Sequence, residues 1–222
     1  MRSFARVDAR QAFYVSSGIR HGFQVIQQVV RPEQGDITLD GEDIRRLPMY
    51  QRARKGIGYL PQEPSIFRKL TVRENLKAVL EISGMGRSNG NSGGIQGEVD
   101  RLLEEFNLTN FADRDGYRLS GGERRRAEIA RAIALKPMFM LFDEPFAGID
   151  PIAIIELKRM LTYLKSKGLG ILITDHNVRE TLSITDRAYI ISNGKVLAEG
   201  TPDDLIRNPS VKEAYLGEEF RL

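Results

Sequence analysis

From residue 36 onward, short apolar and often β-branched runs alternate with segments of helical periodicity. This alternation is typical of a parallel sheet covered by helices. Strands are predicted at residues 37–39, 57–60, 138–142, 171–174, 188–191 and 196–198. The run at 138–142 is apolar without alternation, as in a strand that is buried on both faces. We therefore expect an α/β fold with this strand in the middle of the sheet.

Helices are predicted where apolar residues recur at helical spacing. Residues 71–82 and 123–135 form two of them, the second with Ile129, Ala130, Ile133 and Ala134 facing inward. Another presents Val99, Leu102, Leu103 and Phe106 on one face. A further helix begins at Asp150, an N-cap residue followed by proline, and its expected apolar stripe is Ile152, Ile155, Leu157, Met160, Leu161 and Leu164. Thr201 begins one more helix by the same logic.

Residues 83–97 connect the predicted helix at 71–82 to the predicted helix that carries Val99 and Phe106. This segment is rich in glycine, serine and asparagine. This composition is typical of a flexible connector. A phosphate-binding role is disfavoured, because no apolar strand precedes the segment and no Lys-Thr or Lys-Ser pair follows it. We expect a linker without a function of its own.

Composition narrows the class of protein. A chain of 222 residues is long enough for a single domain with a large core. The absence of cysteine excludes a disulfide scaffold and a thiolate nucleophile. No apolar run approaches the roughly twenty residues that span a bilayer, and the first residues lack the apolar core of a signal peptide. We expect a cytoplasmic protein, and the net charge of +3 gives only weak support for an acidic partner.

The segment Ser120-Gly121-Gly122-Glu123 begins a predicted helix and is a candidate anion site. Its glycines let a ligand approach the backbone, and the unpaired amides at a helix start favour a phosphate. The Ser120 hydroxyl adds a donor. Taken alone, Ser-Gly-Gly is more often an ordinary turn. The interpretation as an anion site therefore depends on other candidate ligand-binding residues in the sequence.

Polar residues follow three predicted strands, at the edge of the sheet where α/β proteins bind ligands. Asp143 and Glu144 follow one strand, while His176 and Gln62 follow two others. We expect Asp143 and Gln62 to hold Mg²⁺, and Glu144 to orient and deprotonate an attacking water. His176 is a candidate for contact with a γ-phosphate, although a lone histidine is usually structural.

In their order and spacing, these motifs resemble the nucleotide-binding domain of ABC transporters from about Pro32 to the C-terminus. L-S-G-G-E at 119–123 resembles the ABC signature, M-F-M-L-F-D-E-P at 138–145 the Walker B strand, and A-G-I-D at 147–150 the D-loop. Gln62 resembles the Q-loop glutamine and His176 the switch histidine. The match is specific because several motifs occur in one order across most of the chain.

The resemblance implies a P-loop NTPase-like, RecA-like fold: a mostly parallel sheet flanked by helices, with an inserted α-helical subdomain. We expect the core at residues 31–62 and 119–222, the subdomain at 63–118 and an atypical N-terminus at 1–30. The resemblance further implies that the protein is an ATPase that binds ATP and Mg²⁺ and works as a homodimer. The residues implied in ATP binding are Gln62, Ser120, Gly121, Gly122, Glu123 and Asp150, of which Ser120 to Gly122 serve the partner's ATP.

Within the family, residues 56–70, 174–191 and 214–222 resemble ATPases of bacterial lipopolysaccharide export. This implies membrane-embedded permease subunits, docked beside the Q-loop at Phe67 and Arg68. It also implies a peripheral position on the inner face of the cytoplasmic membrane. ATPases of branched-chain amino-acid import are the alternative within the family.

The sequence departs from the family at the phosphate loop, because no glycine-rich stretch ends in Gly-Lys-Thr or Gly-Lys-Ser. The lysine is expected near Ile19, where residues 18–21 read G-I-R-H. Residues 12–17 are bulky or polar where a phosphate nest needs a permissive backbone, and residues 23–30 keep the apolar face of the following helix. We therefore expect the chain to bind ATP poorly and hydrolyse little as a homodimer, yet to supply its signature to an intact subunit.

Two functions of other classes stay open from the sequence. A non-catalytic docking subunit would keep the permease contacts and donate only the signature. A nucleic-acid-associated ABC protein is suggested by Arg124, Arg125 and Arg126. The single-domain length and the lack of a long coiled-coil pattern argue against that second class, so we expect no nucleic-acid partner.

Overall fold

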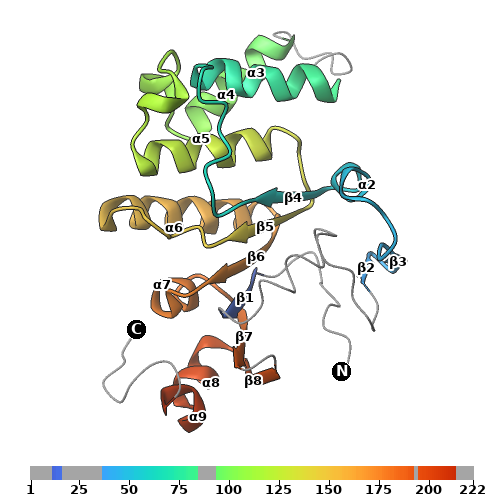
Figure 1. Cartoon of the computed structure of the whole chain (residues 1–222), viewed down its shortest axis with the longest axis vertical. Helices are drawn as coiled ribbons and strands as arrows, with labels where there is room; N and C mark the ends of the chain where they lie inside the picture. The colour runs from blue at the N-terminus through green and yellow to red at the C-terminus, as the bar shows by residue number, and fades with distance from the viewer. Residues whose placement is uncertain (1–11, 17–36, 85–93, 193–194, 214–222) are drawn as a thin grey trace.

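The computed structural model describes residues 12–16, 37–84, 94–192 and 195–213 (Figure 1). Within these ranges a single large sheet has the strand order β4-β5-β6-β1-β7-β8. Its strands are β1 (Ala12–Ser16), β4 (Ile57–Leu60), β5 (Phe139–Asp143), β6 (Gly170–Asp175), β7 (Arg187–Ser192) and β8 (Lys195–Gly200). All neighbours pair in parallel except β7 and β8, which are antiparallel. The predicted strands of this sheet are therefore present: β4 has the predicted bounds, and the bounds of the others are shifted by one or two residues.

Strand β5 is buried on both faces, as its unbroken apolar run predicts. It is the second strand of the sheet, next to the edge strand β4, and does not lie in the middle as the sequence predicts. Met140 and Phe142 belong to a hydrophobic cluster that also contains residues of the helices. Phe139 and Leu141 belong to a separate cluster with Ile37 and other residues. Because side chains alternate between the faces of a strand, these two clusters lie on opposite sides of the sheet.

Strand β1 is an element for which the sequence predicted no strand. Residues 12–16 form a parallel strand between β6 and β7. This extended backbone agrees with the expectation that these residues do not form a phosphate nest. The strand ends at Ser16, in register with Asp175 of β6. The predicted loop at 18–21 and the predicted helix at 23–30 lie outside the described residues.

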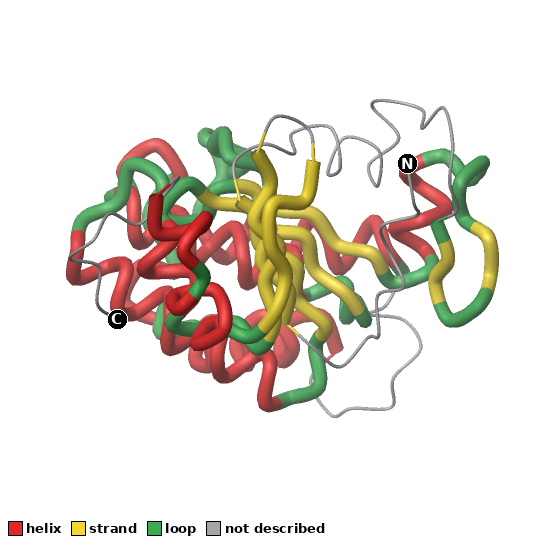
Figure 2. The backbone as a smooth tube through the Cα atoms, turned by 90° about the horizontal axis from the view of Figure 1, so that it is seen from below, coloured by secondary structure: helices red, strands yellow, loops and turns green. Residues whose placement is uncertain are grey.

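The helices gather at the two ends of the sheet and on one face. Figure 1 shows α3 (Val72–Ser83), α4 (Gly94–Glu105) and α5 (Gly121–Ile133) beyond the β4 edge. At the other end, α8 (Pro202–Arg207) packs on β7 and β8 and is followed by α9 (Pro209–Val211). The remaining strands and α-helices are β2 (Thr38–Leu39), β3 (Glu42–Asp43), α2 (Met49–Arg54), α6 (Pro151–Ser166) and α7 (Val178–Leu182). Two 3-10 helices, η2 (Thr109–Phe111) and η3 (Gly116–Arg118), precede α5. In Figure 2 the strands lie between most of the helices on one side and the β2–β3 hairpin on the other.

Two helix starts follow the predicted capping logic: Asp150 caps α6 by accepting from the N–H of Ala153, and Thr201 forms a capping box at the start of α8. Thr71 forms a further capping box at the start of α3. The start of α4 differs from expectation, because residues 94–97 are the first turn of that helix and not part of a linker. Residues 85–93 lie outside the described residues.

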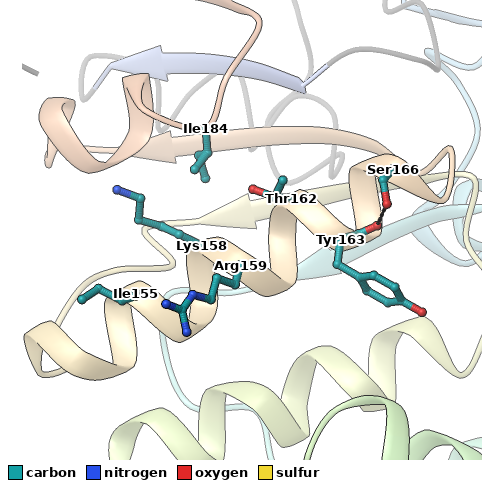
Figure 3. Close-up of a pocket in the computed structure, with 7 residues that line it drawn as sticks. All are labelled: Ile155, Lys158, Arg159, Thr162, Tyr163, Ser166 and Ile184. Atoms are coloured by element: carbon teal, nitrogen blue, oxygen red, sulfur yellow. Dashed lines mark hydrogen bonds between the residues drawn. The ribbon is translucent and has the colours of Figure 1, made fainter.

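Helix α6 shows where the hydrophobic pattern misleads. Leu157, Leu161 and Leu164 are buried as predicted, but Ile152 and Ile155 are 73% and 52% exposed. Residues two positions apart point to nearly opposite sides of a helix, so Ile155 and Leu157 cannot share one face. Figure 3 shows Ile155 on the outer side of α6, in an open hollow of about 510 Å³ lined by Ile155, Lys158, Arg159, Thr162, Tyr163, Ser166 and Ile184.

No helix among the described residues has both the length and the apolar character needed to cross a bilayer.

Candidate functional site

The carboxyl ends of three neighbouring strands bring Gln62, Glu144 and His176 together. Gln62, just after β4, donates a hydrogen bond from Nε2 to Oε2 of Glu144 at 2.7 Å. Nδ1 of His176, which follows β6, lies 3.4 Å from the same oxygen. Parallel strands end at one edge of a sheet, and that edge is where open α/β sheets bind ligands.

Asp143, the last residue of β5, is held by hydroxyl groups from the strands on both sides. Oγ1 of Thr174 on β6 donates to Oδ1 of Asp143 at 2.7 Å. The hydroxyl of Tyr59 on β4 lies 3.4 Å from Oδ2. Both oxygens of this carboxylate are therefore oriented by hydrogen-bond donors. Sequence reasoning missed Tyr59 and Thr174, although each stands within three residues of a recognised motif residue.

Glu144 has a left-handed backbone, with φ of 43°. Residues with a side chain rarely adopt this conformation, and holding one there costs about 1–3 kcal/mol. The backbone N–H of Glu144 donates to the carbonyl of Thr174 at 2.7 Å, which supports the turn. The chain thus turns sharply where the strand delivers its second carboxylate. Such strain is concentrated at functional sites.

Asp175 is a buried carboxylate that sequence reasoning missed, and its side chain is 1% exposed. It accepts hydrogen bonds from the backbone N–H of Phe146 at 3.2 Å and of Asn177 at 2.8 Å. Burial raises the pKa of this carboxyl group above its ordinary value. Asp175 therefore ties the segment after Glu144 to the segment that carries His176. The only sequence signal was its place between an apolar strand and a histidine.

The predicted anion site lies at the start of α5, which packs against the start of α6. Ser120 Oγ accepts from the N–H of Glu123 at 3.3 Å, and Glu123 Oε2 accepts from the N–H of Ser120 at 2.8 Å. Asp150 caps α6 by accepting from the N–H of Ala153 at 2.9 Å. A Cβ atom placed on Gly122 would lie 2.6 Å from Cβ of Ala153, so the two helices meet as closely as glycine permits. Ser120 and Asp150 thus serve as helix caps here.

Phe67 and Arg68, the predicted docking residues, lie on the surface a few residues after Gln62. The Phe67 side chain is 45% exposed, and the guanidinium of Arg131 on α5 stacks 4.8 Å from the centre of its ring. The backbone carbonyl of Arg68 accepts from the N–H of Tyr117 at 3.1 Å. This aromatic and basic surface therefore rests on α5 and on the turn that precedes it.

The donor chemistry at the strand ends suits a hard cation. Within the described part of the chain, no set of three or more histidine, aspartate or glutamate side chains is arranged as a metal cage. Mg²⁺ does not require one, because it is usually held by one or two carboxylates with waters and substrate phosphates. Asp143 and the side-chain carbonyl of Gln62 offer oxygen donors of that kind.

Two family models match the chain. The model for the ABC transporter matches residues 22–147, and the model for the branched-chain amino acid ATP-binding cassette transporter matches residues 195–221. The first of these covers more than half of the 222 residues.

Similar proteins cover most of the chain. The lipopolysaccharide export system ATP-binding protein LptB of Haemophilus influenzae is 54% identical over 200 residues, which are 90% of this chain and 81% of that protein. LptB of Escherichia coli K12 is 51% identical over 200 residues with the same coverage. Among solved structures, the ADP conformation of MJ1267, an ATP-binding cassette of an ABC transporter, has a TM-score of 0.79 at 26% identity. That comparison covers 95% of this chain and 89% of MJ1267.

Proposed function

Because the chain belongs to the ABC transporter family, we propose that it is the ATP-binding subunit of a transporter that exports lipopolysaccharide. The family fold expected from the sequence is confirmed by the likeness to MJ1267. The cargo is inferred from the two LptB relatives, whose similarity extends over 90% of the chain. The model for the branched-chain amino acid transporter matches only residues 195–221, so a branched-chain amino acid is the less favoured cargo.

The observation that carries the proposal is the convergence of Gln62 and His176 on one oxygen of Glu144. Glu144 is the base that orients and deprotonates the attacking water. His176 supports the γ-phosphate as its charge develops. Asp143 and Gln62 would hold Mg²⁺, which when bound neutralises charge on the phosphates. Every one of these groups stands at the carboxyl edge of the sheet.

The signature residues act on a neighbouring subunit. Ser120 to Glu123, at the start of α5, point their helix dipole toward the phosphates of a nucleotide held by the partner. Asp150 caps α6, whose residue Ala153 packs against Gly122, and we assign it to the same surface. The core at 31–62 and 119–222 carries the catalytic edge, and the subdomain at 63–118 includes α3 and α4, which pack against each other.

The chain's own phosphate-binding half is deficient, because the sequence contains no Gly-Lys-Thr or Gly-Lys-Ser. We infer that a homodimer hydrolyses little ATP and that pairing with an intact subunit yields one productive composite site. This sequence feature also supports the second candidate function, a docking subunit that donates only the signature. In both cases the chain is peripheral to the cytoplasmic face of the membrane and binds permease subunits at Phe67 and Arg68.

Co-purification with the permease subunits of a lipopolysaccharide exporter tests the proposed function. We expect the chain to remain bound to the permease, and the double variant Phe67→Ala with Arg68→Ala to be lost from it. A matched control is Tyr50→Ala, an exposed aromatic on α2. Failure of the native chain to bind the permease would overturn the proposal. Retention on immobilised ATP then separates an ATP-binding subunit from one that only donates the signature.

A further inference from the structure

A buried ion pair on α5 lies outside the roles described so far. Arg125 and Glu128 are one helical turn apart, and Nη1 of Arg125 is 3.3 Å from Oε2 of Glu128. Their side chains are only 8% and 1% exposed. Desolvation lowers the pKa of the buried guanidinium, and the charge of Glu128 counteracts that shift. The helix that carries the pair is the one that begins at Ser120.

Glu128 holds the chain just after Gln62. Its Oε1 accepts hydrogen bonds from the backbone N–H of Ser65 at 2.7 Å and of Ile66 at 3.1 Å. These residues lie more than sixty positions away in the sequence, so the contact joins α5 to the segment that follows β4. One carboxylate oxygen therefore fixes two consecutive amides.

Arg125 holds the chain just before Gln62 and just before Glu144. Its Nη1 donates to the carbonyl of Pro61 at 2.7 Å, and its Nη2 donates to the carbonyl of Asp143 at 3.2 Å. The guanidinium thus binds the residue immediately preceding each partner of the Gln62–Glu144 hydrogen bond. The planar fork of arginine suits this double contact, which a single ammonium group cannot reproduce.

Stability alone is a poor explanation for such a pair. Desolvation of two charges offsets much of their attraction, and well-packed apolar residues often serve a core as well or better. The contacts instead converge on the backbone around two proposed catalytic-edge residues. That convergence points to a role in placing them.

We propose that Arg125 and Glu128 are positioning residues that couple the orientation of α5 to the contact between Gln62 and Glu144. When the start of α5 moves, as it would on meeting a partner's nucleotide, the pair carries the 61–66 segment and the end of β5 with it. The functional meaning of this coupling rests on the proposed function, whereas the mechanical link is a property of the isolated chain.

Amide hydrogen exchange on the isolated chain tests the link without nucleotide or permease. Glu128→Ala removes the acceptor for Ser65 and Ile66, and we expect roughly ten-fold faster exchange there, with a smaller increase at Glu144. Glu128→Gln keeps an acceptor oxygen and should restore most of the protection at Ser65 and Ile66. The matched control is Arg126→Gln, which breaks an ion pair of the same helix with Glu156 on α6. It should leave the 61–66 segment protected.

The coupling between α5 and the 61–66 segment is tested by displacing the first turn of α5. Gly122→Ala forces the first turn of α5 away from Ala153, and we expect faster exchange at Ser65 and Ile66 as a result. In a Glu128→Ala background the same displacement should add nothing, because the connection is already broken. Additive effects, or equal loss of protection across α5 and the sheet in every variant, would overturn the proposal. Because no nucleotide is used, this outcome is independent of whether the chain serves a transporter.

Discussion

Gln62 donates a 2.7 Å hydrogen bond to Glu144, although the two residues are 82 positions apart in the sequence. The contact exists because β4 and β5 are neighbouring parallel strands whose carboxyl ends meet. His176 approaches the same carboxylate oxygen from β6. The proposed base, Glu144, therefore lies between a neutral amide and an imidazole.

Gly122→Ala should lower stability, because its new methyl group would stand 2.6 Å from Cβ of Ala153. Overpacking of this kind costs about 1–3 kcal/mol in free energy of unfolding, measured by urea denaturation. Gly121→Ala is the control, since its Cβ would meet Ile149 at an ordinary 3.5 Å. Adding Ala153→Gly to the Gly122→Ala variant should recover part of the loss. Equal stability of the two alanine variants would contradict the close packing of α5 on α6.

Thr174→Val should destabilise the chain by about 1–3 kcal/mol, because Asp143 loses its nearest hydroxyl donor while side-chain volume is nearly kept. Thr174→Ser retains the hydroxyl and should lie much closer to the native protein. Thermal unfolding of the three proteins measures the difference. If serine and valine behave alike at this position, the hydroxyl does not support Asp143.

Asp175→Asn should change how stability depends on pH. Burial raises the pKa of Asp175 above 3.8, so the folded state binds more protons than the unfolded state between 3.8 and the raised pKa. The contribution of this group is therefore complete below 3.8 and is lost as pH rises through the raised value. Asparagine does not titrate, so it contributes no pH dependence to the free energy of unfolding. It does have one hydrogen-bond acceptor oxygen fewer than aspartate.

Urea denaturation from about pH 4 to about pH 8 checks this sign. The advantage of the native protein over Asp175→Asn should shrink as pH rises. An advantage that stays constant or grows with pH would show that Asp175 is not destabilised by burial.

Local patterns in the sequence are sufficient to predict many elements of the fold. The run at 57–60 is β4 with the predicted bounds, because apolar and β-branched residues there meet a proline immediately afterwards. Asp150 and Pro151 predict the start of α6 because capping is decided within a single turn. Gln62, Glu144 and His176 are also predictable as a group, since parallel strands share one carboxyl edge.

Features that depend on distant partners are not predictable in this way. Ile152 and Ile155 are apolar but exposed, because burial depends on what packs against α6 and not on its own composition. Arg125 and Glu128 read as part of a charged helix face, whereas their partners lie after β4 and at the end of β5. Strand β1 escapes prediction because its position is decided by pairing with β6 and β7.

Complementation of ATP hydrolysis tests the central claim most directly, namely that the chain supplies a working signature but lacks its own phosphate loop. The chain is mixed with an ABC ATPase subunit that carries a Gly-Lys-Thr loop but has its signature serine replaced by arginine. We expect little hydrolysis from either protein alone, restored hydrolysis in the mixture, and loss of the restored activity with Ser120→Arg. Hydrolysis by the chain alone at a rate ordinary for transport ATPases, abolished by Glu144→Gln, would contradict the account, as would a mixture that stays inactive.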